Sequence, residues 1–227
     1  MAPRSIGTLR ETPLHAALKQ HLAQPADQLE VTVDGFVADI LRGQQVLEVQ
    51  TQNFAAFRRK LAHLLERRPV CVIHPIALEK WVVNVNARGT VMSRRKSPQR
   101  GTAWEIFAEL VSVAELATHP NFSLQVCLVR EEEVRVRTRK RRRWGRTHRV
   151  AERRLLEVVE TIFLAALADY VRFLPDALPE PFTSTELAKA LRQPVWLAQK
   201  MTYCLRKMGV LSVAGKRRGA WLYARAV

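Results

Sequence analysis

Three acidic residues lie at regular intervals in one stretch of the sequence that is predicted to form three short strands. Residues 28–51 read QLEVTVDGFVADILRGQQVLEVQT, with Glu30, Asp39 and Glu48 spaced along them. Asp39 interrupts the apolar segment GFVADIL, where an isolated carboxylate is costly. Three like charges side by side destabilise a sheet, and a bound divalent cation would relieve their repulsion. These residue types at this spacing therefore predict a Mg²⁺ or Mn²⁺ site.

Two tight turns set the register of this three-stranded meander. Asp34-Gly35 and Gly43-Gln44 are two-residue hairpin signals, and together they place Asp39 opposite both Glu30 and Glu48. Directly opposite residues have Cβ atoms about 5 Å apart, close enough for two carboxylates to share one cation. Gln50 would point to the same face and could orient a water molecule or a phosphate oxygen. The opposite face is predicted to be wholly apolar, formed by Val31, Val33, Phe36, Ala38, Ile40, Leu47 and Val49. The alternative for Glu48 and Gln50 is ordinary polar alternation on an exposed strand.

Composition limits the class of protein and its partners. The chain has 227 residues, 48% hydrophobic and 26% charged, which is typical of a globular protein of one large or two small domains. The net charge of +16 predicts a polyanionic partner, the alternative being a basic but inert surface. Cys71, Cys127 and Cys204 lie in apolar runs without a C-x-x-C pair, which predicts buried free thiols and no zinc site. Neither a signal peptide nor a membrane span is evident, so we expect a cytoplasmic protein.

Helices and further strands are expected around the meander. Thr12-Pro13 begins a helix that runs to about residue 23, with Glu11 at its start, and His15 and His21 are interpreted as surface residues. An amphipathic helix with a basic face is predicted over residues 51–68. Strands over residues 70–76 and 81–86 complete a mixed α/β order. The fold class is therefore α/β, with a mixed central sheet flanked by helices.

The rest of the first region carries two basic segments. Residues 88–102 form a basic loop, residues 103–117 a helix and residues 123–130 a strand, and a long helix is predicted over residues 150–174. The run 134–149 is interpreted as a phosphate-contacting arm, the alternative being an inert tail. The candidate phosphate-binding residues of these segments and of the helix over 51–68 are Arg58, Arg59, Arg94, Arg95, Lys96, Arg139, Lys140, Arg141, Arg142 and Arg143.

The last forty-five or so residues predict a separate module. The predicted division is an α/β domain over residues 1–150, a bridging helix and proline-rich linker over 151–181, and a small domain over 182–227. A helix, a turn, a second helix and a basic hairpin resemble a winged helix-turn-helix, which implies DNA binding. The recognition helix would present Gln199, Lys200, Tyr203 and Arg206, and the wing would present Lys216, Arg217 and Arg218. Protein interaction is the alternative use of such a module.

The first region resembles the PD-(D/E)xK nuclease superfamily, the fold of type II restriction enzymes and archaeal Holliday-junction resolvases. The resemblance rests on the leading helix, the meander with Asp39, the element Glu48-Val49-Gln50 and the basic helix that follows. It implies a restriction endonuclease-like fold in which Asp39 and Glu48 hold Mg²⁺ or Mn²⁺, with Glu11 and Glu30 as further acidic ligands. The sequence departs from the family at Gln50, where lysine is usual. Lys60, on the following helix, would supply that lysine from a migrated position.

The resemblance implies a metal-dependent endonuclease that hydrolyses DNA, with Asp39, Glu48, Gln50 and Lys60 as its catalytic group. A non-catalytic DNA-binding regulator or structural factor with a degenerate nuclease fold is the first alternative, and an RNA-directed nuclease is the second. No membrane partner is expected. The oligomeric state stays open, since double-strand cutters of this fold often act as homodimers.

Overall fold

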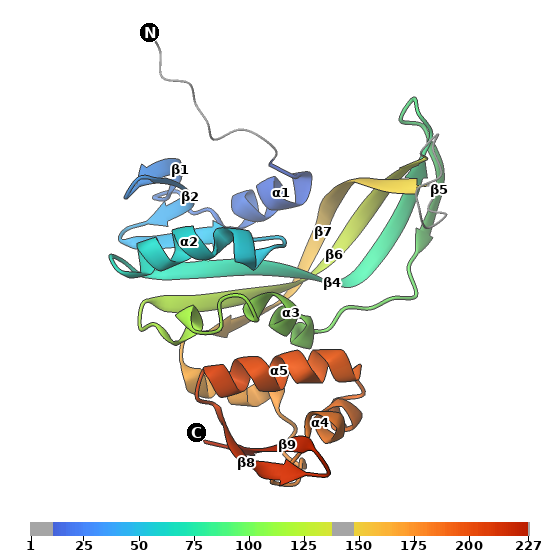
Figure 1. The fold of residues 1–227 in the computed structure, drawn as a ribbon. Helices are drawn as coiled ribbons and strands as arrows, with labels where there is room; N and C mark the ends of the chain where they lie inside the picture. The colour runs from blue at the N-terminus through green and yellow to red at the C-terminus, as the bar shows by residue number, and fades with distance from the viewer. Residues whose placement is uncertain (1–10, 138–147, 227) are drawn as a thin grey trace.

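The computed structural model of the chain describes residues 11–137 and 148–226, in which a seven-stranded mixed sheet is covered on both faces by helices (Figure 1). The main strand order is β1-β2-β3-β4-β6-β7, and β5 pairs with β4 outside this path. No helix within the described ranges is long and apolar enough to cross a membrane. The predicted α/β class with a mixed central sheet is therefore confirmed.

The first half of the described chain follows the predicted order closely. Its elements are α1 (Pro13–Leu22), β1 (Gln28–Val33), β2 (Phe36–Arg42), β3 (Gln45–Val49), α2 (Phe54–Leu65) and β4 (Val70–Val85). The side chain of Thr12 accepts a hydrogen bond from the His15 amide and caps α1, with Pro13 in its first turn. Strands β3 and β4 are parallel, as their connection through α2 requires.

The meander has the predicted turns but a less regular ladder. Val33 pairs with Phe36 and Arg42 pairs with Gln45, as predicted. The paired positions of β2 and β3 extend only to Ile40 and Leu47, so the expected pair of Asp39 with Glu48 does not form part of that ladder. The side chain of Asp39 instead accepts a hydrogen bond from the Val49 amide at 2.8 Å.

The prediction of one wholly apolar face was wrong. Ile40, Leu47 and Val49 pack with Leu14 and Leu18 of α1 in one cluster of buried side chains. Val33 and Ala38 pack in the other cluster, on the side of the sheet that α2 covers. The apolar side chains of the meander therefore change faces near Asp39, where the β2–β3 ladder ends.

Three long strands form the centre of the sheet: β4, β6 (Phe122–Arg137) and β7 (His148–Leu164). The predicted separate strand over residues 81–86 is the second half of β4, and the predicted basic loop contains strand β5 (Val91–Lys96). The predicted long helix over residues 150–174 was wrong, because β7 occupies its first part and a 3₁₀ helix, η3 (Leu167–Phe173), its last. No bridging helix therefore connects the two regions. Ion pairs between β6 and β7, such as that between Glu131 and Arg153, stabilise residues 148–164 as a strand.

Short helical pieces replace the single helix predicted over residues 103–117. These are η1 (Ala103–Glu105), α3 (Ile106–Leu110) and η2 (Leu116–Thr118). Ile106, Phe107 and Leu110 are fully buried against the sheet and α2.

The C-terminal elements are α4 (Ser184–Leu191), α5 (Val195–Lys207), β8 (Leu211–Arg217) and β9 (Ala220–Arg225). They lie beneath α3, at the opposite end of the molecule from β5 (Figure 1). Phe107 of α3 and Met201 of α5 belong to the same buried cluster, and the carbonyl oxygen of Phe107 accepts from the Cys204 thiol. Cys71, Cys127 and Cys204 are buried and free, as predicted.

Candidate functional site

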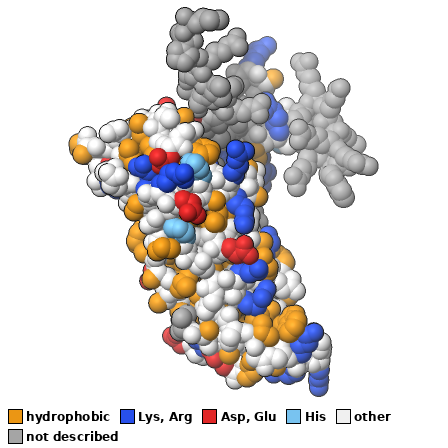
Figure 2. Space-filling view, turned by 60° about the vertical axis from the view of Figure 1, so that its left-hand side comes forward, with side chains coloured by type: hydrophobic (Ala, Val, Ile, Leu, Met, Phe, Trp, Pro, Cys, Tyr) orange, Lys and Arg blue, Asp and Glu red, His pale blue; other side chains and the backbone are white. Residues whose placement is uncertain are grey.

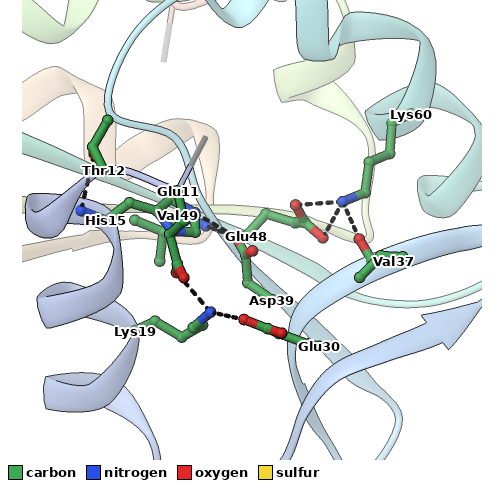
Figure 3. A network of polar contacts seen from close by, with 10 residues as sticks. All are labelled: Glu11, Thr12, His15, Lys19, Glu30, Val37, Asp39, Glu48, Val49 and Lys60. Carbon is green, nitrogen blue, oxygen red and sulfur yellow. Dashed lines mark hydrogen bonds and ion pairs between the residues drawn. The ribbon is translucent and has the colours of Figure 1, made fainter. Parts of the chain in front are cut away.

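The predicted acids lie at the point where β2, β3, α1 and α2 meet (Figure 3). Glu48 is buried, with 1% of its side chain exposed, and Lys60 Nζ of α2 lies 2.6 Å from its carboxylate. Lys60 also donates to the Val37 carbonyl oxygen at 2.6 Å. The lysine that the resemblance placed on the helix therefore reaches the second acid of the element Glu48-Val49-Gln50.

Helix α2 positions Lys60 through its apolar side. Asn53 adopts a left-handed conformation (φ 60°) and caps the helix by accepting from the Ala56 amide. Phe57 and Leu61 are buried on either side of Lys60 in the sequence and fix the rotation of the helix. The Lys60 ammonium lies 5.7 Å from the centre of the Phe57 ring, so its stem follows an apolar surface to the carboxylate.

Helix α1 brings a histidine and a second lysine to the same site. His15 Nδ1 lies 2.8 Å from Glu11 and its Nε2 lies 3.1 Å from Asp39. Lys19 contacts Glu11 at 2.6 Å and Glu30 at 2.5 Å. The structure thus brings Glu11, Glu30 and Asp39 together through His15 and Lys19, neither of which was a predicted site residue, whereas Glu48 contacts the predicted Lys60.

The interpretation of His15 as a surface residue was wrong, because it is mostly buried between two carboxylates. A signal was present in the sequence: Glu11, His15 and Lys19 are spaced by four and so share one side of a helix. Their partners Asp39 and Glu30 lie on other elements, which the helix pattern alone does not reveal.

The two central acids have opposite pKa shifts. Burial raises the pKa of Glu48 to about 7, and the attraction of Lys60 offsets this only in part. Burial acts to raise the pKa of Asp39 as well, but the hydrogen bond and charge of His15 outweigh it and lower that pKa. Asp39 is therefore ionised at neutral pH, whereas Glu48 sits near the midpoint of its titration.

The oxygen atoms of Glu48 and Asp39 are the candidate ligands for a divalent cation. Lys60 Nζ lies 2.6 Å from the buried Glu48 Oε1 and donates to Oε2 at 2.6 Å, so the ammonium contacts both oxygens of the carboxylate. Asp39 uses only Oδ2 in its contacts with Val49 and His15. Carboxylate oxygens are the ligands that Mg²⁺ prefers, and Mg²⁺ often takes one or two carboxylates with several waters. Within the described ranges no group of three or more His, Cys, Asp or Glu side chains is arranged to hold a metal.

Gln50 lies beside the site without joining its network of contacts. Its carbonyl oxygen accepts from His74 Nδ1 at 2.6 Å, and its amide donates to Ile73. Its side chain makes no hydrogen bond to any residue that the structure describes. The predicted role of Gln50 in orienting water stays a prediction.

The basic candidates of the first region lie away from the acids and are largely paired. Arg58 contacts the Ser112 carbonyl oxygen and Glu115, Arg94 contacts Glu132, and Lys96 contacts Glu79. Arg59 and Arg95 are exposed. Arg139, Lys140, Arg141, Arg142 and Arg143 lie outside the described residues. On the face drawn in Figure 2, acidic side chains are interspersed with Lys, Arg and His rather than separated into a patch of one sign.

The C-terminal candidates form an exposed stripe on α5 and a basic hairpin. Gln199, Tyr203 and Arg206 are exposed and lie on the same side of α5 as the half-exposed ring of Trp196. Lys200 lies over the Trp196 ring, and Lys216 lies over the Trp221 ring of β9. Arg217 pairs with Glu186 of α4, and Arg218 is exposed at the turn. The residues predicted for the recognition helix are therefore accessible to a large ligand.

Comparison with known proteins places the region of the acids in a family. Residues 12–165, which contain Asp39, Glu48 and Lys60, match the family described as "Domain of unknown function (DUF8091)". The chain belongs to the DUF8091 family. An uncharacterized protein of Treponema pallidum (strain Nichols) is 30% identical over 186 residues, which cover 82% of this chain and 74% of that protein. No solved structure matches the chain.

The DUF8091 region ends just after β7, at residue 165. It therefore contains α1, the meander and the whole seven-stranded sheet, with every acidic candidate except Glu11. The elements α4, α5, β8 and β9 follow it.

Proposed function

We propose that this DUF8091 protein is a Mg²⁺-dependent nuclease that hydrolyses phosphodiester bonds in DNA. One observation carries the proposal: Lys60 Nζ lies 2.6 Å from Glu48, beside Asp39, at the junction of the meander and α2. Two acids and a lysine are the set that the resemblance to PD-(D/E)xK nucleases requires. The lysine comes from α2, in place of Gln50.

The order of the elements supports the proposal. A helix, a three-stranded antiparallel meander, a helix and a strand parallel to β3 follow one another, with the two acids on β2 and β3. The resemblance to PD-(D/E)xK nucleases rests on this order of elements. The alternation of polar and apolar residues on an exposed strand does not explain Glu48, because its side chain is buried.

Each residue of the site would have a separate role in hydrolysis. Asp39 and Glu48 would hold Mg²⁺, which supplies Lewis-acid activation of a phosphate oxygen and of a water molecule. Lys60 would stabilise negative charge that develops on the phosphate, since its ammonium is already fixed at the edge of the site. His15 would position Asp39 through its Nε2 hydrogen bond.

The C-terminal elements would hold the DNA as a winged helix. The order α4, α5, β8 and β9 fits this arrangement, and α5 leaves Gln199, Tyr203 and Arg206 exposed. The net charge of +16 favours a phosphate-rich partner, and we place DNA ahead of RNA because a winged helix typically reads a duplex groove. The enzyme would act in the cytoplasm.

The proposal is tested by incubating the wild type, Asp39→Ala and Glu48→Ala with plasmid and branched DNA in Mg²⁺, Mn²⁺ or chelator. We expect metal-dependent cleavage by the wild type and loss of cleavage in both variants. Equal activity in all three proteins would end the proposal. A structured RNA substrate in the same assay separates a DNA-directed enzyme from an RNA-directed one.

A non-catalytic DNA-binding protein is the second candidate, and the charge pairing at the site favours it. Each of Glu11, Glu30, Asp39 and Glu48 has a cationic partner among His15, Lys19 and Lys60. In a nuclease-like protein that no longer binds a metal, ion pairs of this kind would neutralise the acids in place of the metal. This candidate predicts salt-dependent DNA binding without cleavage in any metal, and no rise in melting temperature on addition of Mn²⁺.

A further inference from the structure

A cleft of about 820 Å³ lies between the sheet and the helices α3 and α5. It is lined by residues from the β3–α2 loop, β4, β6, β7, the loop before α3, α3 itself and the start of α5. Neither Asp39 nor Glu48 is among them. The volume is typical of a site for a small organic ligand or for one part of a larger one.

Ion pairs neutralise the sheet side of this cleft. Glu131 is buried and accepts from Arg153 Nε and Nη2, at 3.0 and 2.6 Å. Glu133 is bound by Lys80 at 3.2 Å. These carboxylates and cations already satisfy each other, and on the helix side the carboxylates of Glu105 and Glu109 accept from the backbone amides of Thr102 and Phe54. The surface therefore favours neither a bare metal ion nor an isolated phosphate. It suits an uncharged ligand that has both donors and acceptors.

Amide side chains supply both kinds of group. Gln52, Gln99 and Gln193 reach the same cleft from three separate segments. None of their side chains makes a hydrogen bond to another residue in the described part of the chain, so their donors and acceptors are available. His74 lines the cleft as well; its Nδ1 donates to the Gln50 carbonyl oxygen, which leaves Nε2 as an acceptor.

An aromatic ring completes the site. Trp196, in the first turn of α5, lines the cleft and is 51% exposed. A half-exposed indole offers a face on which a planar ring can stack. The edges of nucleobases carry donors and acceptors that amide side chains match.

We propose that this cleft binds an unpaired nucleobase, with Trp196 stacked on the ring and the amides of Gln52, Gln99 and Gln193 at its edge. The choice of a nucleobase over another polar ring rests on the nucleic-acid partner proposed above. A paired base inside a duplex is not accessible to such a cleft, so the base comes from a single strand or is turned out of the helix. The site goes beyond cleavage, because it requires neither Asp39 nor Glu48.

The test measures binding of the four deoxynucleoside 5′-monophosphates and of deoxyribose 5-phosphate to the full chain by calorimetry. We expect each nucleotide to bind at least about tenfold more tightly than the sugar phosphate, since stacking carries the difference. Trp196→Ala should lose about tenfold in affinity. Its matched control is Trp221→Ala, which removes an equally exposed indole that also lies under a lysine. The control should bind as the wild type does. Gln99→Ala and Gln193→Ala should change the preference among the four bases.

Several results would overturn the proposal. Equal affinity for nucleotides and deoxyribose 5-phosphate would leave only a phosphate site. Tighter binding of maltotriose than of any nucleotide would identify a sugar site, and an equal loss in Trp196→Ala and Trp221→Ala would place the base elsewhere. Absence of all nucleotide binding at millimolar concentration would also refute it. Asp39→Ala distinguishes the two proposals: it should keep nucleotide binding whether or not the wild type cleaves DNA.

Discussion

Lys60 and Glu48, on different elements, form a buried contact of 2.6 Å in which the lysine also binds the carbonyl oxygen of Val37. The contact joins α2 to β3 and to the start of β2, two residues before Asp39. Because Glu48 is almost fully buried, its charge has few other sources of stabilisation. The ion pair therefore either only stabilises the fold or also positions the Lys60 ammonium group for catalysis.

Substitution of Lys60 distinguishes these roles. Lys60→Gln keeps a hydrogen-bond donor but removes the positive charge, so we expect the rate of Mg²⁺-dependent DNA cleavage to fall by on the order of 100-fold. Arg67→Gln removes an exposed charge just after α2, at a residue that is not among the candidate phosphate contacts, and should keep the wild-type rate. Circular dichroism establishes that both variants fold. A wild-type rate in Lys60→Gln would exclude a catalytic role for the lysine.

The raised pKa of Glu48 predicts how stability changes with pH. Burial raises this pKa from 4.5 to about 7, so the folded state binds the proton more tightly than the unfolded state does. The resulting stabilisation is fully present below pH 4.5 and is lost as pH rises through 7, a change on the order of 3 kcal/mol. Glu48→Gln lacks this titration. Its free energy of unfolding should therefore rise relative to the wild type between pH 5 and pH 8; a constant difference across that range would contradict the shift.

The exposed basic side chains of the C-terminal elements should contribute to DNA affinity. Arg206→Ala and Lys216→Ala should each weaken binding and reduce the slope of log affinity against log salt by about 1. Lys189→Ala is the control, since Lys189 is exposed on α4 and is not among the proposed contacts. Fluorescence anisotropy with a labelled duplex at several salt concentrations measures the slope. If all three variants have the same slope as the wild type, DNA is not held by α5 and the hairpin.

The pair of Glu131 and Arg153 should matter for stability. Arg153→Ala leaves the buried Glu131 carboxylate without its cation, and we expect a loss on the order of 3 kcal/mol in the free energy of unfolding. Arg154→Ala, on the adjacent and more exposed position, should cost about 0.5 kcal/mol or less. Urea unfolding of the three proteins measures both values. An equal decrease in the free energy of unfolding in the two variants would mean that burial of Glu131 does not determine the loss of stability.

Local signals made the first half of the fold predictable. The turns at Asp34-Gly35 and Gly43-Gln44, the cap at Thr12 and the spacing of Phe57, Leu61 and Leu64 fix α1, the meander and α2 without reference to the rest of the chain. The position of Lys60 near Glu48 was expected only from the resemblance to PD-(D/E)xK nucleases. The partners of His15 were missed because Asp39 lies 24 residues away on another element.

Strand β7 could not be predicted in this way, for an identifiable reason. Its ladder with β6 has three register shifts, each of which breaks the alternation of faces that marks a strand. Leu155, Val159 and Ile162 then recur at spacings of three and four, which fit a helix equally well. Pairing with β6, including the contact between Arg153 and Glu131, decides the outcome, and the local pattern of residues 148–164 does not reveal that pairing.

The central claim is that Asp39 and Glu48 share a divalent cation, and a crystal soaked in Mn²⁺ above pH 7 tests it most directly. Glu48 is then ionised, and a cation that it shared with Asp39 Oδ1 would take the place of the Lys60 ammonium at one of its oxygens. We predict anomalous density between the two carboxylates, absent from an Asp39→Ala crystal soaked in the same way. No density there, with His15 and Lys60 still bound to the two acids, would contradict the claim and favour the non-catalytic DNA-binding protein.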